Sequence, residues 1–202
     1  MDIFNQLKEK LLPHLSSNKK IGVSISGGFD SAVMFWCCCA IAQQENLDCV
    51  FRAFTVKRGD NSEEHSRNIV NYISTQFGIS VQHSFVGDPS VSHDQQAWSG
   101  IVHANKISDV VLIGDTNVPE CLQSIDSAPI RKPVGISSCI QPMLNWNKDV
   151  VVQLAIDLGL YNIMKLSHTC TERQHERCNE CWQCTERAWA FDQCNYTDPG
   201  TL

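Results

Sequence analysis

The chain has 202 residues, of which 43% are hydrophobic and 19% are charged, and its formal net charge at pH 7 is −6. These values predict a folded chain with an ordinary core and argue against disorder or a broad nucleic-acid-binding surface. No apolar run approaches the ~20 residues that span a bilayer, so we expect no membrane protein. The eleven cysteines are odd in number and no secretory signal precedes them, which favours a cytoplasmic protein with reduced or metal-bound thiols.

The first buried strand is expected over residues 21–25, after an amphipathic helix over residues 2–15. The strand runs into a glycine turn at residues 26–28, and an apolar segment of helical length follows over residues 32–42. A strand, a glycine turn and a helix start bring free backbone N–H groups and the helix dipole to one place. This arrangement predicts an anion-binding loop.

The glycine turn reads Ser-Gly-Gly-Phe-Asp-Ser over residues 26–31. This spacing matches neither the Walker A motif nor the pattern G-x-G-x-x-G. Glycine lets the backbone approach phosphate oxygens and adopt a positive φ, and a hydroxyl in the first helical turn can add a hydrogen bond. A plain turn before a helix is the alternative. We expect the phosphates of a nucleotide to be held here by Ser24, Ser26, Gly27, Gly28, Asp30 and Ser31.

The helix expected over residues 32–42 carries three consecutive cysteines, Cys37, Cys38 and Cys39. Consecutive helical positions point about 100° apart, so these thiols cannot converge on one metal ion. We expect them to be small buried side chains that pack against the sheet.

Three further strands are expected over residues 48–56, 79–86 and 109–115, with helices over residues 62–77 and 94–106 between them. This alternation predicts an α/β fold with an open, mostly parallel twisted sheet and helices on both faces. Ligands of such sheets bind beyond the carboxyl ends of the strands, so the residues at those ends are further candidates.

Three residues lie at these strand ends. Thr55 is expected to contribute to an adenine or ribose pocket, mainly through backbone groups, and Gly114 to face the nucleotide. Asp115 is a candidate for holding Mg²⁺ on the phosphates, with a helix or turn cap as the equally open alternative. Residues 122–138 contain prolines and show little periodicity, which predicts a loop over the site.

After a helix expected over residues 145–158, four cysteines have the spacing Cys-x7-Cys-x2-Cys-x2-Cys. Four thiolates suit tetrahedral Zn²⁺ and leave no open coordination position, while an iron–sulfur cluster is the main alternative. His168, His175 and Cys194 are expected to lie outside the ligand set. The predicted ligands are Cys170, Cys178, Cys181 and Cys184.

The loop over residues 26–31 resembles the pyrophosphate-binding loop of the PP-loop ATP pyrophosphatases, which cleave ATP between the α and β phosphates. Pro142, Lys148 at a helix start and the pair Leu158-Gly159 resemble the same family. The resemblance implies that Lys148 reaches the outgoing pyrophosphate. A solvated lysine on a helix face is the alternative.

The order of the loop, the four cysteines and residues 187–191 (Arg-Ala-Trp-Ala-Phe) resembles the 7-cyano-7-deazaguanine synthases. In that family a deazaguanine carboxylate is adenylated, converted by ammonia to an amide and taken on to a nitrile. The resemblance implies a nucleotide-binding domain over residues 1–165, a four-cysteine zinc segment over residues 166–202, the cofactors ATP, Mg²⁺ and Zn²⁺, and a homodimer. The family's Tyr-Gly-Gln is replaced by Lys-Arg-Gly-Asp at residues 57–60, so the carboxylate substrate is left open as a deazapurine-like or another small molecule.

The sequence therefore predicts an AMP-forming, ATP-dependent ligase that joins a small carboxylate to ammonia or an amine. No membrane partner is expected; the net charge argues against a nucleic-acid partner but leaves a local basic patch open. Two alternatives stay open. One is a sulfurtransferase acting on a tRNA base, for which Cys121 is the candidate sulfur-carrying cysteine. The other is a nucleotide-binding subunit without catalysis. The predicted catalytic residues are Asp30, Ser31, Asp115 and Lys148.

Overall fold

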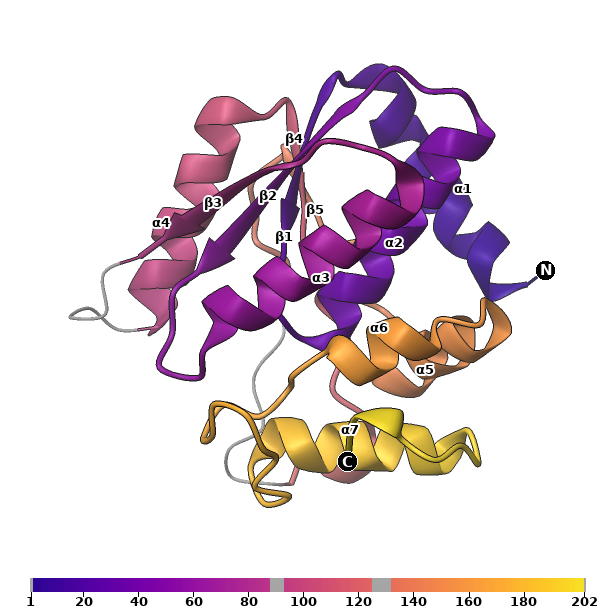
Figure 1. Cartoon of the computed structure of the whole chain (residues 1–202), viewed down its shortest axis with the longest axis vertical. Coiled ribbons are helices and arrows are strands. Elements are labelled where there is room, and N and C mark those ends of the chain that lie inside the picture. The colour runs from indigo at the N-terminus through magenta and orange to yellow at the C-terminus, as the bar shows by residue number, and fades with distance from the viewer. Residues whose placement is uncertain (1, 88–92, 125–131, 202) are drawn as a thin grey trace.

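The structure, a computed structural model, describes residues 2–87, 93–124 and 132–201. Its centre is a five-stranded sheet in the order β3-β2-β1-β4-β5, and every neighbouring pair of strands is parallel (Figure 1). The predicted α/β fold class is therefore confirmed. The strands are β1 (Lys20–Ser24), β2 (Val50–Val56), β3 (Gln82–Val86), β4 (Val110–Leu112) and β5 (Cys139–Ile140).

Helices cover both faces of this sheet and the edge beyond its strand ends. Their bounds are α1 (Ile3–Ser17), α2 (Phe29–Gln44), α3 (Ser62–Phe77), α4 (His93–Ile107), α5 (Lys148–Asp157), α6 (Tyr161–Leu166) and α7 (Trp182–Gln193), with short 3₁₀ turns η1 (Glu120–Leu122) and η2 (Pro199–Thr201). None of the described helices is long and apolar enough to cross a membrane.

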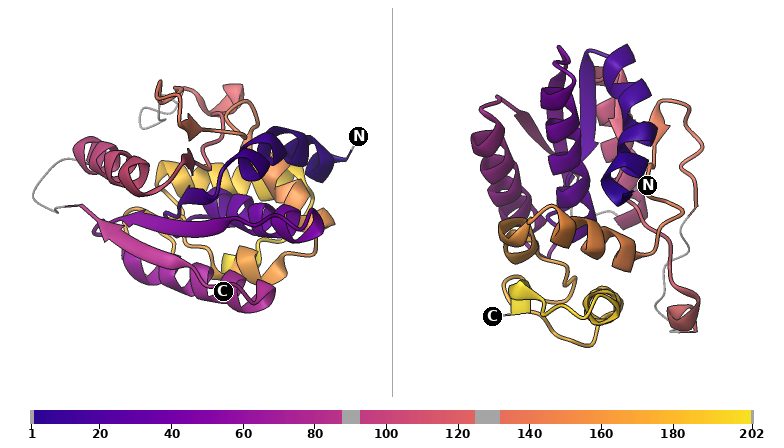
Figure 2. Two further views of the ribbon diagram at one scale, coloured as in Figure 1. Left: turned by 90° about the horizontal axis from the view of Figure 1, so that it is seen from above. Right: turned by 90° about the vertical axis from the view of Figure 1, so that its right-hand side faces the viewer.

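Alternate residues of each strand face opposite sides of the sheet and meet different helices. Ile21 and Val23 of β1 belong to the main core with residues of α2 and α3, whereas Phe54 and Val111 form a smaller cluster with Ala104 of α4. Helices α2 and α3 therefore cover one face of the sheet and α4 covers the other (Figure 2).

The three consecutive cysteines lie on α2, in the middle of the main core. Cys37, Cys38 and Cys39 are at most 3% exposed, and burial raises the pKa of each thiol. The prediction that they are buried core side chains is confirmed. Their neutral thiols fill space against the sheet.

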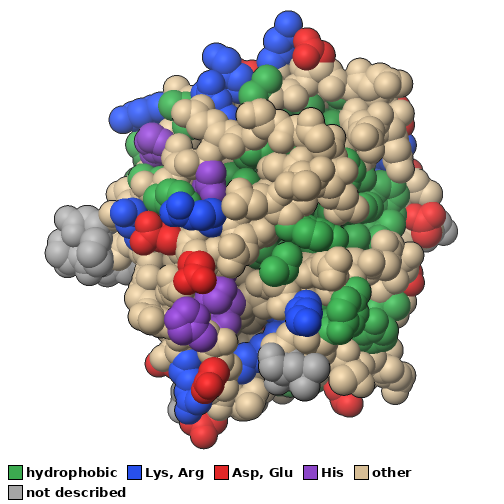
Figure 3. Space-filling model, viewed as in Figure 1, with side chains coloured by type: hydrophobic (Ala, Val, Ile, Leu, Met, Phe, Trp, Pro, Cys, Tyr) green, Lys and Arg blue, Asp and Glu red, His purple; other side chains and the backbone are tan. Residues whose placement is uncertain are grey.

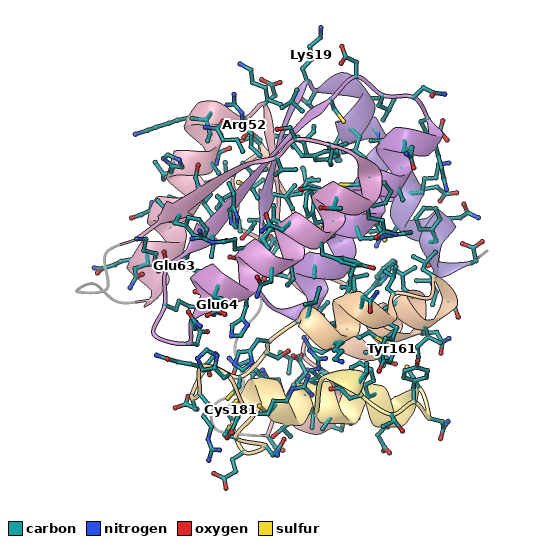
Figure 4. The ribbon with its side chains drawn as sticks, viewed as in Figure 1. Lys19, Arg52, Glu63, Glu64, Tyr161 and Cys181 are labelled. Carbon is teal, nitrogen blue, oxygen red and sulfur yellow. The ribbon has the colours of Figure 1, made fainter. Side chains whose placement is uncertain are left out.

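The central strand β1 lies between β2 and β4, so the order of the strands reverses beside it. In a parallel sheet such a reversal opens a crevice at the carboxyl ends of the central strands. Figure 4 places Lys19, just before β1, at one end of the molecule and Cys181 at the other. The segment that carries the four cysteines therefore lies beyond the carboxyl ends of the strands.

The largest differences from the predicted elements lie in the second half of the chain. Helices α6 and α7 were not predicted, β4 is shorter than the strand expected over residues 109–115, and the predicted loop over residues 122–138 falls partly outside the described residues. Ala190 and Phe191 of α7 also belong to the main core. The predicted domain boundary at residue 165 thus does not coincide with a break in the core.

The last turn of the described chain is tied down by a buried ion pair. Arg187 on α7 is 0% exposed, and its Nε and Nη2 donate hydrogen bonds of 2.7 and 2.8 Å to the two carboxylate oxygens of Asp198. The remaining guanidinium donors reach the backbone and hydroxyl oxygens of Ser167, the hydroxyl of Thr169 and the carbonyl of Met164. Such a paired and fully hydrogen-bonded charge is tolerated in a core.

Replacing Asp198 with Asn is expected to lower the free energy of unfolding by about 3 kcal/mol, because Arg187 would stay buried without its counter-charge. Burial alone would raise the pKa of Asp198, but hydrogen bonds and charges of Arg187 and Arg177 lower it below its usual value. The ionised carboxylate therefore stabilises the fold above its unfolded-state pKa, and this contribution is lost as the pH falls through the folded-state pKa. Urea unfolding at neutral and acidic pH measures both effects.

The matched control is Glu176→Gln, which removes one partner of the exposed Arg173–Glu176 pair, 3.5 Å apart. Exposed pairs contribute little, so its stability should stay close to that of the wild type. Equal losses in Asp198→Asn and Glu176→Gln would contradict the importance of the buried pair.

Candidate functional site

The turn after β1 has the shape of an anion-binding loop. Gly27 has a φ of +83°, and a Cβ there would lie 2.8 Å from the Cβ of His65 and 3.2 Å from the backbone nitrogen of Ser66. Gly28 is the N-cap of α2, its N–H donates to Ser26 Oγ at 3.2 Å, and its carbonyl accepts a hydrogen bond from Ser31 Oγ. Only glycine fits at position 27, because both the positive φ and the close approach of α3 exclude a side chain.

The end of β4 comes against this loop. A Cβ at Gly114 would lie 2.8 Å from the Cα of Ser31 and 3.0 Å from its backbone nitrogen. Glycine at this position therefore lets the β4 end touch the first turn of α2. The following residue, Asp115, is held by a hydrogen bond of 2.9 Å from Gln141 Nε2, beside β5.

A cleft of about 470 Å³ opens at this meeting point of β1, β4 and the C-terminal segment. Most of the residues predicted from the sequence line it together: Ser24, Ser26, Gly28, Asp30, Ser31, Gly114, Asp115 and Lys148. Gly27 lies behind the lining, where its carbonyl accepts a hydrogen bond of 2.9 Å from the His168 backbone. The residues singled out by pattern thus converge on one place.

Thr55 is the exception among the predicted residues. Its side chain is buried, donates a hydrogen bond of 2.6 Å to the carbonyl of Ile25 and lies 2.8 Å from His83 Nε2. Its strand neighbours Phe54 and Val56 line the cleft instead. Since successive strand residues face opposite ways, the Thr55 side chain does not line the cleft, and a contribution of its backbone groups to nucleotide binding stays a prediction.

Lys148 is the first residue of α5 and is 3% exposed, so it is not a solvated surface lysine. Its Nζ forms an ion pair with Asp30 Oδ2 of the glycine loop and lies 3.1 Å from Glu186 Oε2 of α7. The ammonium therefore joins the phosphate-loop candidate to the helix that follows the cysteines. Glu186 was not predicted from the sequence.

The loop over residues 57–60 forms the rim of the cleft. Arg58 lines the cleft and pairs with the buried Asp60 at 2.7 Å, whereas the exposed Lys57 pairs with Glu63 at 3.4 Å. A second hollow of about 400 Å³ continues from the cleft between this loop and Thr171. The rim is polar and joins the two halves of the chain.

The four predicted metal ligands come together. The Sγ atoms of Cys170, Cys178, Cys181 and Cys184 all lie within 4.8 Å of one another, and among the described residues no other group of this kind is found. A Zn–S distance of about 2.3 Å places the corners of a sulfur tetrahedron about 3.8 Å apart. The donor set therefore fits one tetrahedral ion.

The tight turn between Cys178 and Cys181 favours the thiolate form of one cysteine, which is the form that binds a metal ion. Backbone N–H groups of Cys181 and Glu180 point at Cys178 Sγ, at 3.1 and 3.4 Å, and these hydrogen bonds lower the pKa of the Cys178 thiol to about 7. Asn179 makes the turn possible with a φ of +61°. In contrast, burial raises the pKa of Cys184, so a bound cation is what would favour its thiolate.

Two histidines connect the cysteine segment with the glycine loop. The rings of His65 and His168 stack with their centres 4.2 Å apart, and their Nε2 atoms bond the carbonyls of Gln174 and Arg173. Burial lowers the pKa of His168, with the hydrogen bond to Arg173 acting in the opposite direction. Histidine side chains gather on this face of the molecule, as the purple atoms in Figure 3 show. His168 and His175 are not part of the four-cysteine group, as predicted.

Comparison with known proteins gives a match to one family model over part of the chain and similarity to several solved structures. Residues 115–195 match the model of the family described as queuosine biosynthesis protein QueC, and no curated protein sequence matches. Among solved structures, NMN synthetase from Francisella tularensis is 17% identical with a TM-score of 0.53, covering 96% of this chain and 84% of that one. The U34-tRNA thiolase NcsA from Methanococcus maripaludis, solved with its 4Fe–4S cluster, is 15% identical with a TM-score of 0.53, covering 96% and 70%. NAD+ synthetase from Burkholderia pseudomallei is 16% identical with a TM-score of 0.45, covering 78% and 72%.

The chain thus has the fold of the PP-loop ATP pyrophosphatases, as its glycine loop predicted. Within that fold class, its C-terminal part is similar to QueC, over fewer than half of the residues of the chain. The region of similarity includes Lys148, the four cysteines and Glu186.

Replacing Gly27 with Ala is expected to weaken ATP binding at least about tenfold, because a Cβ would push the loop away from α3 and strain its backbone. Isothermal titration calorimetry measures the affinity. Gly59→Ala is the control, since a Cβ at Gly59 would meet no atom within 4 Å. Unchanged ATP affinity in Gly27→Ala would contradict a phosphate-binding function of this loop.

Replacing Cys184 with Ser is expected to release the bound metal and to lower the melting temperature, because α7 begins inside the cysteine cluster. Elemental analysis of the purified chain and thermal unfolding measure the two effects. Cys194→Ser should retain the metal, since Cys194 lies outside the cluster and donates to the Asp149 carbonyl at 3.4 Å. Equal metal content in both variants would speak against the assigned ligand set.

Proposed function

We propose that the chain is an ATP-dependent, AMP-forming ligase that adenylates a small carboxylate for attack by ammonia or an amine. The observation that carries this proposal is the convergence of the glycine loop, Gly114, Asp115 and Lys148 on one cleft at the carboxyl ends of the central strands. Open α/β sheets bind ligands at such a point. The similarity of residues 115–195 to QueC supports an activity of this kind.

In this proposal the glycine loop binds the two terminal phosphates and leaves the α phosphate open to the carboxylate. The N-terminus of α2 and the hydroxyls of Ser26 and Ser31 face the cleft and can hydrogen-bond phosphate oxygens. Negative charge grows on the leaving pyrophosphate, and the Lys148 ammonium at the cleft wall would stabilise it.

Mg²⁺ fits the acidic groups of the same cleft. Asp30 Oδ1 is buried and accepts no hydrogen bond from the described residues, and Asp115 also lines the cleft. Carboxylate oxygens of this kind suit a hard divalent cation. When bound, the ion would supply charge neutralisation on the phosphates.

For the cysteine site we propose Zn²⁺ in a structural capacity. Four thiolates close the coordination shell, so no position is left for catalysis. The sulfur atoms also lie close enough for a single ion. In a 4Fe–4S cluster each thiolate binds a different iron, which places the sulfurs farther apart than around one zinc.

The substrate class follows from the polar walls beyond the phosphate loop. Arg58, Thr171 and Gln183 line both the cleft and the adjoining hollow, and they offer cationic and hydrogen-bonding groups suited to a small polar carboxylate. Such groups accept a deazapurine-like acid or another small acid. The amine donor would enter the same open cleft.

A tRNA sulfurtransferase is the weaker candidate on the geometry. Cys121, the thiol that the sequence offered for sulfur transfer, is exposed on η1 and is not among the described residues that line the cleft. A sulfur carrier must reach the activated atom. The ligase is therefore the function that the described cleft supports best.

The direct test is carboxylate-dependent exchange of labelled pyrophosphate into ATP, together with identification of the nucleotide product. We expect AMP and pyrophosphate, and a Lys148→Met variant should exchange about 100-fold more slowly because the leaving-group charge loses its partner. Lys165→Met, at an exposed lysine of α6, should match the wild type. Formation of ADP and phosphate instead would refute an AMP-forming ligase.

A further inference from the structure

Glu186 of α7 has an unusual position for a carboxylate. Its side chain is 1% exposed, it lines the nucleotide cleft, and neither of its oxygens accepts a hydrogen bond from the described residues. Its partner is the Lys148 ammonium, 3.1 Å from Oε2. Burying a carboxylate costs free energy, which an ion pair only partly offsets.

The ion pair with Lys148 does not fully offset the negative charge of Glu186. Lys148 already pairs with Asp30 of the glycine loop. The buried Glu186 and the half-buried Asp30 therefore share one ammonium, and the group of three carries one excess negative charge. Among the described residues that line the cleft, Asp115 and Arg58 add one charge of each sign, so the excess of one negative charge remains.

This charge balance opposes the binding of a bare polyphosphate. A polyphosphate anion next to an excess carboxylate in a partly desolvated cleft is repelled, whereas the same anion chelated by a divalent cation is not. The repulsion is strongest where water is excluded, and Glu186 is almost completely buried. Its charge therefore affects whether the cleft accepts a polyphosphate bare or chelated by a divalent cation.

We propose that Glu186 is a specificity-determining residue of the cleft, which makes the cleft bind metal-chelated polyphosphate in preference to free polyphosphate. The inference deepens the proposed function and rests on it in one respect, the binding of phosphates at the glycine loop. Glu186 acts through its buried negative charge and through its hold on Lys148.

The cysteine segment contributes to this preference for chelated polyphosphate because it holds Glu186 in position. Glu186 follows Cys184 by two residues on the same helix, and the next residue, Arg187, is locked by Asp198. The metal site at one end of α7 and the buried ion pair beside Glu186 therefore fix where the carboxylate stands. The Lys148 ammonium thus meets one carboxylate from the glycine loop and one from the helix that the cysteine cluster anchors.

The test is the binding of inorganic pyrophosphate to the purified full chain, measured by isothermal titration calorimetry with Mg²⁺ and with a chelator. The wild type should bind pyrophosphate more tightly with Mg²⁺ by about tenfold or more. In Glu186→Gln, metal-free pyrophosphate should bind about tenfold more tightly than in the wild type, because one nearby negative charge is gone. The gain from Mg²⁺ should shrink by the same factor.

Glu176→Gln is the matched control, since it removes an equal charge from an exposed position on the cysteine segment. It should leave both affinities unchanged, because solvent and salt screen its charge. Melting temperature and metal content are measured for each variant. A purely structural function of Glu186 would change these two quantities and not the ratio of affinities with and without Mg²⁺.

Unchanged affinity for metal-free pyrophosphate in a folded Glu186→Gln variant would overturn the inference. If that variant does not fold, Glu186→Met removes the same charge with a side chain of similar length, and the same result is required of it. Wild-type binding of pyrophosphate with Mg²⁺ but no formation of AMP would refute the ligase and leave this inference standing. Absence of pyrophosphate binding in the wild type under both conditions would refute both.

Discussion

The buried ammonium of Lys148 is the interaction on which the site depends. It pairs with Asp30 of the glycine loop and with Glu186 of α7, so one charge joins the N-terminal third of the chain to its end. Glu186 is buried and Asp30 half-buried, so both carboxylates would be costly without this cation. Lys148 is the first residue of α5, so its ion pairs fix the distance between the glycine loop and the cysteine segment. The cleft exists because these three elements meet around it.

Much of this arrangement was predictable because short local patterns encode it. The glycine turn predicted an anion-binding loop, and the spacing of four cysteines predicted a metal site whose sulfur atoms the structure brings within 4.8 Å. Backbone constraints explain why both patterns are visible in the sequence. A positive φ at Gly27 and a tight turn at Asn179 are needed whatever packs around them, so their residue types are visible in the sequence.

The buried charges were not predictable in the same way. In the sequence, Glu186 and Arg187 look like solvated residues of a polar segment, and α7 was missed for this reason. The overlooked signal is the spacing of Trp182, Glu186, Arg187, Ala190 and Phe191, which places both charges on the buried face of one helix. Their partners lie far away in sequence, at Lys148 and Asp198, and only the tertiary fold brings them together. The Thr55 side chain lies away from the cleft for a simpler reason, since successive residues of a strand face opposite sides of the sheet.

The contacts of the cysteine segment argue that the four-cysteine group supports the cleft structurally. From Cys170 the chain leads back by two residues to His168, whose backbone N–H holds the Gly27 carbonyl and whose ring stacks on His65. From Cys184 it leads forward to Glu186 and to Arg187, which lies 5.4 Å from the ring centre of Phe29 in the first turn of α2. Both ends of the cluster therefore touch the glycine loop or its supports. A closed tetrahedral ion is well suited to this task, because it fixes four backbone positions that a polar segment with few apolar residues could not fix by packing.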